Sequence, residues 1–497
     1  MEKKVGIIGA GISGLVACKF TLSKGYHPVV FEAKTTIGGV WTKTVETTKL
    51  QTPKHFYQFS DFPWPNSVTE VFPTQPQVFD YLQSYAGHFG LLEHIRFGCK
   101  VVGIDYEGMA AEAEMEGWGV WGGTGEAFGS GKWSVTVQDT QSSSTEEFSG
   151  IPNIPEFPEG KGPEVFDGKV IHSMEYATMD FEAAKQLIRG KRVTVVGFQK
   201  HALDIAMECS LQNGVENPCT VLYRNEHWNV PDYNPWGVSL AYFYFNRFSE
   251  LLVHKPGEGF FLSLLATLLS PLRWGFSKFV ETHIKRKLRL AKYGMVPKHS
   301  FLKEISSCLI STVPEGFYDA VEKGSIILKK APSFGFCKQG ILVDGEVEPL
   351  KTDMVTLATG FRGLDKLKDI FASQTFQEQS HSIGECIHPR IPQLAIIGFS
   401  ESISNLHTSE MRCRWLAELL AGTFKLPDIK DMEKDITKWD RYMKTYSGNY
   451  YRRSCIGALH IWYNDQLCKD MGWKPKRKKG FIAELFEPYV PMDYAHP

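Results

Sequence analysis

Several absences narrow the class of this 497-residue chain. Its ten cysteines form no C-x-x-C pair, so neither a redox dithiol nor a cysteine-ligated zinc site is expected, and we predict no metal site. Such scatter is typical of reduced thiols in a cytosolic-type compartment. The scattered residues are Cys18, Cys99, Cys209, Cys219, Cys308, Cys337, Cys386, Cys413, Cys455 and Cys468.

Neither the charge balance nor the apolar runs indicate a nucleic-acid partner or a membrane-spanning helix. The 55 basic and 56 acidic residues nearly cancel, so no nucleic-acid partner is expected. The longest apolar run, 260–272, contains Pro271 and is shorter than the ~20 residues that a membrane-spanning helix needs. The chain starts with a strand pattern and shows no signal peptide. We therefore expect a cytoplasmic protein that is not secreted.

A glycine-rich turn begins the part of the sequence that does carry information. The apolar run 5–8 ends in G-x-G-x-x-G, and apolar residues then recur at helical spacing. The glycines allow a tight turn, close approach of a pyrophosphate and close helix–strand packing, while the helix start attracts the anion. Glu32 ends the next apolar run, where an acid binds a ribose hydroxyl. This predicts cofactor binding, rather than a ligand-free turn, by Gly9, Ala10, Gly11, Ile12, Ser13 and Gly14.

A second glycine pair follows Glu32. Gly38 and Gly39 precede Val40 and Trp41, and such a pair can bring the backbone close to a flat cofactor. We predict cofactor contacts for Gly39 and Trp41; the alternative is an ordinary turn with a packed tryptophan.

A second strand–turn–helix unit repeats this pattern about 190 residues later. An apolar strand ends at Gly197, and the next strand, 220–223, ends at Arg224. Arginine in place of an acid suits the 2′-phosphate of NADP, although a solvated strand-end charge is the alternative. The predicted NADP-binding residues are Gly197, Phe198, Gln199, Lys200, His201, Ala202 and Arg224.

Two such units predict an α/β flavoprotein with two Rossmann-like dinucleotide-binding domains. The NADPH domain is expected as an insertion in a discontinuous FAD domain, to which strands near 354 and 394 return. Hydride then passes from nicotinamide to flavin. The expected parts are the first FAD segment, 1–180; the NADPH domain, 181–350, with a helical and aromatic insertion at about 236–290; the FAD return, 351–445; and a C-terminal extension, 446–497.

The insertion allows two interpretations. Its apolar run, 260–272, is followed by a basic segment, 283–289, and this combination can lie on a membrane surface. We favour a packed helix pair with a solvated face and keep peripheral membrane contact as a hypothesis. Neither pattern sets the oligomeric state.

Several motifs resemble the flavin-containing monooxygenases, and the resemblance spans nearly the whole chain. Residues 166–176 fit their F-x-G-x-x-x-H-x-x-x-[YF] signature, 358–361 fit A-T-G-[YF], and 410–415 fit E-x-x-x-R-W. Residues 297–301 and 386–392 are similar to the plant branch of that family.

The resemblance implies FAD, NADPH and O₂ as co-substrate, with a C4a-hydroperoxyflavin that oxygenates the nitrogen or sulfur of a small-molecule nucleophile. Water must be kept from this peroxide. It also implies FAD contacts for Thr359 and Gly360. Gln51 stands where many relatives carry a pocket asparagine, so it is the candidate catalytic residue. Aromatic loops suit an apolar substrate without naming it.

Departures from the family pattern leave alternatives open. A strand expected before residue 148 is absent next to Glu147, which could weaken FAD retention, and Gln199 and His201 replace the usual glycine and serine of the NADP turn. A Baeyer–Villiger-type monooxygenase shares the architecture. The other alternative is a degenerate flavoprotein with a regulatory or guanylate cyclase-like role. The cyclase-like role is suggested by residues 292–296 together with Lys303 and Glu304, which loosely resemble short centres proposed for plant nucleotide cyclases.

Overall fold

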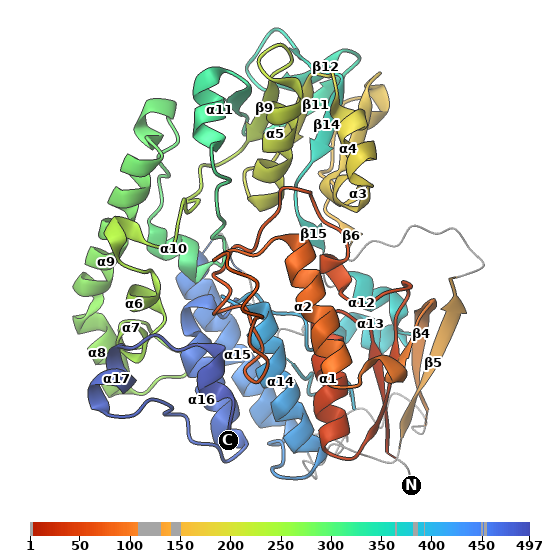
Figure 1. Ribbon diagram of the computed structural model, residues 1–497, viewed down its shortest axis with the longest axis vertical. Coiled ribbons are helices and arrows are strands. Elements are labelled where there is room, and N and C mark those ends of the chain that lie inside the picture. The colour runs from red at the N-terminus through yellow and green to blue at the C-terminus, as the bar shows by residue number, and fades with distance from the viewer. Residues whose placement is uncertain are drawn as a thin grey trace.

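Two sheets of parallel strands and a long helical segment beside them form the framework of the molecule (Figure 1). The structure is a computed structural model. It describes residues 3–107, 131–140, 151–362, 365–380, 386–391, 393–448, 451 and 455–497. The region of the missing strand next to Glu147 lies outside these residues.

The first sheet is small and carries the N-terminal turn. Its strands are β1 (Lys4–Ile8), β2 (His27–Phe31) and β3 (Ile95–Arg96), all parallel and in that order. Helix α1 (Ile12–Ser23) connects the first two strands and packs against α14 (Asn405–Leu420), although the two are far apart in sequence. Helix α2 (Gln75–His88) also borders this unit (Figure 1). The E-x-x-x-R-W motif, 410–415, therefore lies within α14.

The second sheet has five parallel strands in the order β10-β9-β8-β14-β7. Strands β8 (Val193–Val196), β9 (Cys219–Tyr223) and β14 (Met354–Leu357) are buried along their whole length, as expected for parallel strands covered on both faces. β7 (Lys169–His172) and β10 (Ile326–Lys330) are the edges. The helices of this unit are α3 (Ser173–Thr178), α4 (Phe181–Ile188), α5 (Lys200–Asn213) and α11 (Phe317–Lys323).

The pairing of β14 corrects the expected chain path. We predicted that this strand returns to the first unit, but it lies between β8 and β7 in the second sheet. An apolar four-residue strand can enter either parallel sheet, because both are buried on two faces. The strand predicted over 394–398 is also wrong, since Ala395 forms only an isolated bridge with Ile387.

Several antiparallel strands lie outside the two parallel sheets. Strands β4 (Cys99–Glu107) and β5 (Lys132–Asp139) pair with each other at one edge of the molecule (Figure 1). β6 (Ile151–Pro152) pairs with β15 (Phe361–Arg362). The remaining strands are β11 (Phe334–Cys337), β12 (Gly340–Val343) and β13 (Leu350–Lys351), and the short helices near the first pair are α12 (Asp365–Ile370) and α13 (Gln374–Ser380).

The insertion is helical, as expected, but most side chains of its apolar run are exposed and not buried against the rest of the protein. Helix α8 (Phe260–Leu268) buries only Ala266, whereas Phe260 and Phe261 are 74% and 82% exposed. The preferred interpretation of a packed pair is therefore wrong for α8. Among the described residues no single helix is suited to cross a membrane; α8 and α9 (Ser270–Lys287) together reach the length and composition but meet at a 46° bend. The other helices are α6 (Ala241–Tyr244), α7 (Arg247–Leu251) and α10 (Phe301–Ser306).

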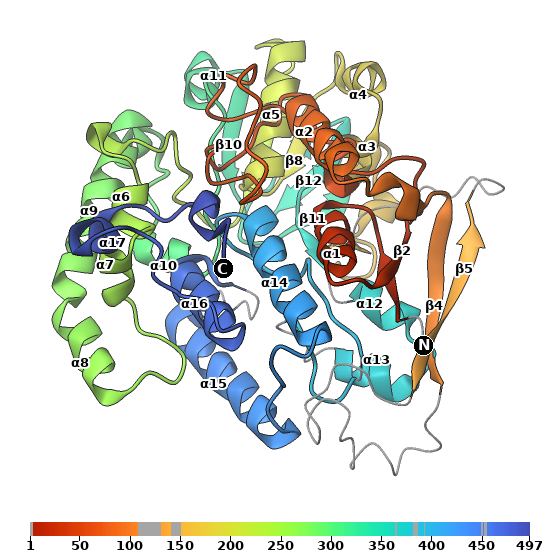
Figure 2. The same cartoon turned by 60° about the horizontal axis from the view of Figure 1, so that its bottom comes forward.

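The C-terminal helices join the insertion to the first unit. α15 (Ile429–Ser447) and α16 (His460–Asp470) form one hydrophobic core with α14, and α17 (Phe481–Phe486) lies beside α7 (Figure 2). Cys308, just after α10, forms a disulfide with Cys455 at a Cα–Cα distance of 5.7 Å. The expectation that every cysteine is a free thiol is wrong for this pair, because tertiary packing brings together residues 147 positions apart.

Candidate functional site

The turn between β1 and α1 requires glycine at two of the three positions of the pattern, Gly9 and Gly14. Gly9 has φ +91°, which favours glycine, and a Cβ on Gly14 would meet the carbonyl oxygen of Gly9 at 1.8 Å. A Cβ on Gly11 would meet the Cα of Gly39 at 3.5 Å. The segments around Gly11 and Gly39, which are separated along the chain, therefore approach each other closely. A narrow cradle of bare backbone remains between them.

The start of α1 is arranged for an anion. The helix begins after Gly11, which has no side chain to cap the first N–H groups, and the first turn contains no acidic residue. These N–H groups and the positive end of the helix dipole suit a phosphate. The cradle and the uncapped helix start thus fit the pyrophosphate of a dinucleotide. Ser13 faces another element: its Oγ lies 2.9 Å from the Oγ of Ser409 on α14.

Glu32 is buried beside this turn and holds its backbone. Its Oε2 accepts a hydrogen bond from the N–H of Ala10 at 2.6 Å, and its Oε1 accepts one from Lys34 at 2.9 Å. Each carboxylate oxygen retains a second lone pair. The acid is therefore fixed at the strand end from which it could reach a ribose, and this contact stays a prediction.

Trp41 lies at the border between the first unit and a cavity. Its indole N–H donates to the hydroxyl of Tyr57 at 3.0 Å, and the rings meet edge to face. Its ring is therefore held in one orientation while it lines the cavity. The neighbouring Gly39 belongs to the cradle described above.

The second turn repeats the glycine requirement. Gly197 has φ +132°, and a Cβ there would meet the carbonyl oxygen of Ala358 at 2.5 Å. Phe198 and Ala202 are buried in the core under the turn rather than facing a ligand. Gln199 precedes α5 and donates from Nε2 to the carbonyl of Leu309 at 3.3 Å. The side chain that departs from the family pattern is thus turned toward the segment after α10.

The remaining residues predicted for NADP divide into two groups. Lys200 lies 2.8 Å from Asp204, a buried carboxylate that also accepts from Thr48 of the first unit. His201 faces the cavity, and burial lowers its pKa. Arg224 directly follows β9, is exposed, and forms no ion pair with the described carboxylates, so its guanidinium is available for a phosphate.

Thr359 and Gly360 follow β14 and therefore lie next to the second turn. The Thr359 hydroxyl donates to the carbonyl of Asn153, and the Asn153 N–H donates to the carbonyl of Gly360 at 3.0 Å. Gly360 has φ +88°. These contacts fasten the link between β14 and β15 to the strand entering from the first unit. The FAD contacts implied for the two residues stay predictions.

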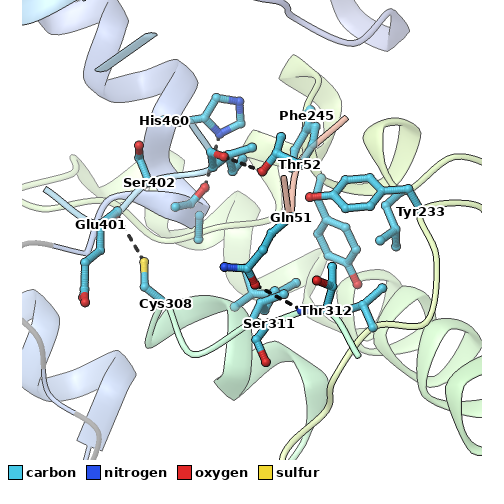
Figure 3. Close-up of a pocket in the computed structure, with 18 of the residues that line it drawn as sticks. Gln51, Thr52, Tyr233, Phe245, Cys308, Ser311, Thr312, Glu401, Ser402 and His460 are labelled. Atoms are coloured by element: carbon cyan, nitrogen blue, oxygen red, sulfur yellow. Dashed lines mark hydrogen bonds between the residues drawn. The ribbon is translucent and has the colours of Figure 1, made fainter. Parts of the chain in front are cut away.

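Gln51 points into a cavity of about 550 Å³ that lies between the two units and the insertion (Figure 3). Its Oε1 accepts from the N–H of Thr312 at 3.1 Å, so the amide nitrogen is turned the other way. No described residue accepts from that nitrogen. The walls come from Trp41 and Thr52 of the first unit, from Lys200 and His201, and from the insertion.

Sequence reasoning missed most of the charged residues of this cavity, among them Glu250 and Arg273. Glu250 lies on α7, and burial raises its pKa to about 7. Arg273, on α9, reaches the cavity with one hydrogen bond, to the Oγ of Ser306 at 3.3 Å, and burial lowers its pKa. The only available signal was an arginine directly after an apolar run. An arginine at that place marks the end of an apolar run and does not by itself indicate a pocket residue.

The E-x-x-x-R-W motif fixes the loop that leads to the cavity. Glu410 is completely buried on α14 and accepts from the Ser60 N–H at 2.8 Å and from its hydroxyl at 2.6 Å. Arg414 lies 3.0 Å from the same carboxylate. Burial alone would raise the pKa of Glu410, but His407, Arg414 and Ser60 lower it to about 2. The motif is therefore a buried clamp between α14 and the loop that follows Gln51.

Two glycine turns with a shared cavity define a dinucleotide-dependent oxidoreductase that binds a flavin at one turn and a nicotinamide nucleotide at the other. The family described as flavin-binding monooxygenase-like matches residues 2–486. The chain belongs to this family and is a flavin-dependent monooxygenase that uses FAD, NADPH and O₂. The predicted resemblance, fold class and cofactors are thus confirmed.

Relatives match over almost the whole chain. A probable flavin-containing monooxygenase 1 of Arabidopsis thaliana is 40% identical, with 99% of this chain and 96% of that protein covered. Human flavin-containing monooxygenase 1 is 26% identical, with coverages of 99% and 87%.

Solved structures share the fold at low sequence identity. An oxidised steroid monooxygenase bound to NADP has a TM-score of 0.62 and 17% identity, with 95% of this chain and 98% of that chain covered. Cyclohexanone monooxygenase with bound epsilon-caprolactone has a TM-score of 0.63 and 16% identity, with the same coverages.

Proposed function

We propose that this monooxygenase oxygenates a nitrogen or sulfur atom of a small molecule held in the cavity beside Gln51. The observation that carries the proposal is the position of Gln51, in a cavity lined by residues of both nucleotide units. When bound, the flavin supplies the activated oxygen. The side chains described here hold the substrate, exclude water and position that oxygen.

Exclusion of water is the first task of the cavity walls. Aromatic side chains line much of the cavity, among them Phe243 and Phe245 of the insertion and Tyr233 just before it. Tyr233 and Phe245 lie near Gln51 (Figure 3). An apolar enclosure strengthens the few polar contacts inside it and protects reactive oxygen from water. Such walls suit a small substrate with a large apolar part.

Gln51 is suited to hold the reacting oxygen. The N–H of Thr312 must meet an acceptor, which fixes the amide with Oε1 toward Thr312 and the Nε2–H donors toward the cavity. A positioned donor stabilises negative charge that develops on oxygen during transfer. A soft nucleophile carries the lone pair that attacks oxygen, so no side chain is required to remove a proton from it.

The test combines turnover with a matched pair of variants. Purified FAD-loaded enzyme is given NADPH and O₂ with a tertiary amine, a thioether or a cyclic ketone, and products are identified by mass spectrometry. N-oxide or S-oxide formation supports the proposal. Ester or lactone formation from the ketone alone would replace it with the Baeyer–Villiger alternative.

The variants separate the role of Gln51 from general effects. Gln51→Ala is expected to lower oxygenated product about 10- to 100-fold and to divert NADPH oxidation to hydrogen peroxide, because one oriented donor is lost. Gln212→Ala, on the far part of α5, is the control and keeps wild-type coupling. Equal coupling in both variants would contradict the assignment of Gln51.

The guanylate cyclase-like alternative meets side chains that are already engaged. Lys292 lies 2.6 Å from Glu322, and the hydroxyl of Tyr293 contacts the same carboxylate at 3.0 Å. Met295 is buried in the hydrophobic core. These contacts favour a structural role for the segment, and the monooxygenase proposal does not depend on it.

A further inference from the structure

Two histidines and a glutamate converge outside the cavity on a site that no motif predicted. His227 lies in the loop after β9, His299 lies just before α10, and Glu304 is on α10. One carboxylate oxygen of Glu304 is 2.8 Å from Nδ1 of His227, and the other contacts Nε2 of His299. The three donor atoms all lie within 4.8 Å of one another.

Burial distinguishes this cluster from ordinary surface pairs. The Glu304 side chain is 0% exposed, whereas His227 and His299 are 14% and 13% exposed. A fully buried carboxylate needs charged or strongly polar partners. The imidazoles supply them and also form the only edge of the cluster that solvent can reach.

The backbone that carries the ligands is held firmly in place. The indole N–H of Trp228 donates to the carbonyl of His299 at 2.7 Å, which ties the two histidine segments together. Glu281 of α9 accepts from the N–H of Phe301 at 3.0 Å, and Ser300 caps the start of α10. The positions of all three ligands are therefore set by contacts outside the cluster, as a preorganised site requires.

We propose that His227, His299 and Glu304 bind a divalent first-row transition metal, with zinc as the ion best matched to the donors. Two imidazole nitrogens and one carboxylate oxygen form a donor set that zinc and its neighbours accept, with bonds of about 2.0–2.2 Å. The partly exposed edge leaves a position for water. Because the rings now touch the carboxylate directly, they move slightly away from it to admit the ion among the three donor atoms.

The proposed ion fastens two walls of the substrate cavity. Val230 and Tyr233 follow His227 along the chain, while Phe301, Leu302 and Ile305 surround Glu304 on α10, and all five line the cavity. A bond from each segment to one ion fixes their separation. The role inferred for the metal is therefore structural, and it rests on the geometry of the cluster and not on the proposed reaction.

The competing explanation is a hydrogen-bonded His–Glu–His network without an ion, and metal binding to the FAD-loaded enzyme separates the two. The protein is treated with a chelator, dialysed against micromolar zinc and freed of unbound ion, and the retained zinc is measured by mass spectrometry. About one zinc per chain is expected. Wild-type protein that retains none overturns the proposal.

Variants assign the bound ion. His227→Ala and His299→Ala are expected to lose the zinc, and Glu304→Gln, which keeps shape and hydrogen bonding, is expected to lose most of it. His283→Ala is the matched control: His283 lies 3.2 Å from Asp232 in a similar histidine–carboxylate pair without a third ligand. Flavin absorbance reports whether each variant is folded. Zinc retained by His227→Ala, or lost by His283→Ala, would place the ion elsewhere and refute the site.

A second readout is independent of stoichiometry. Since an ion that binds only the folded state stabilises it, zinc is expected to raise the melting temperature of wild type and of His283→Ala but not of His227→Ala. An equal rise in all three proteins would show that zinc acts outside the cluster.

Discussion

Replacement of Gly14 by alanine tests the first nucleotide turn most directly. A Cβ at this position would lie 1.8 Å from the carbonyl oxygen of Gly9, and contacts shorter than 3.0 Å are essentially never observed. The start of α1 must therefore move away by about 1.2 Å, the difference between these two distances. The obstacle is backbone, so no side-chain rotation relieves it.

The movement has a calculable effect on the cofactor. An N–H···O bond of about 2.9 Å that lengthens by about 1.2 Å is no longer a hydrogen bond. Hydrogen bonds to charged groups contribute about 1.5–3 kcal/mol each. Loss of two of them to the pyrophosphate weakens FAD binding by about 3–6 kcal/mol, or roughly 10²- to 10⁴-fold.

A second glycine-to-alanine variant provides the control. Gly87 is an exposed residue inside helix α2, and a Cβ there meets no atom within 4 Å. Alanine is expected to stabilise this helix by about 0.5–1 kcal/mol. Flavin titration of the apoprotein gives the FAD affinity, and urea unfolding gives the stability. If Gly14→Ala binds FAD as tightly as wild type and Gly87→Ala, the proposed role of the turn is refuted.

Three further predictions address other parts of the molecule. Arg224→Ala is expected to raise the KM for NADPH about 10- to 100-fold and to leave that for NADH unchanged, because only NADPH carries the 2′-phosphate; equal effects on both nucleotides would contradict this. Folding lowers the pKa of Glu410 from 4.5 to about 2, so the ionised carboxylate adds about 3 kcal/mol to the free energy of unfolding. This contribution is present above pH 4.5 and is lost as the pH falls toward 2. Urea unfolding across this range should show that loss in wild type and not in Glu410→Gln, which is less stable throughout. Because Phe260 and Phe261 are exposed, the protein is expected to float with anionic vesicles in a flotation assay. Replacement of both residues by serine should abolish flotation, whereas the control Val347→Ser, at a lone exposed apolar residue, should not. Wild-type protein that stays in the soluble fraction would exclude membrane contact.

The two nucleotide turns could be predicted because their chemistry is local. Gly9, Gly11 and Gly14 follow one another within a single turn, and their conformational demands depend on adjacent backbone. The prediction for Arg224 is equally local, since this residue directly follows the strand next to its turn. In both cases the residues that matter are neighbours in sequence, and the family motifs supported them.

The placement of β14 could not be predicted, because the apolar pattern of a buried parallel strand does not name its partner strands. The exposure of α8 is similar: an apolar run shows what a helix could bury and not whether a neighbour covers it. The disulfide between Cys308 and Cys455 depends on two segments 147 residues apart. Spacing rules for cysteines address only short separations.

By itself the sequence determined the two dinucleotide turns, the α/β class and the monooxygenase family, since each depends on contiguous motifs. Only the tertiary structure decided which sheet β14 joins, which charged residues reach the cavity, and that His227, His299 and Glu304 meet at one point. These are long-range properties, created when segments that are distant along the chain pack against one another, and no local pattern encodes them.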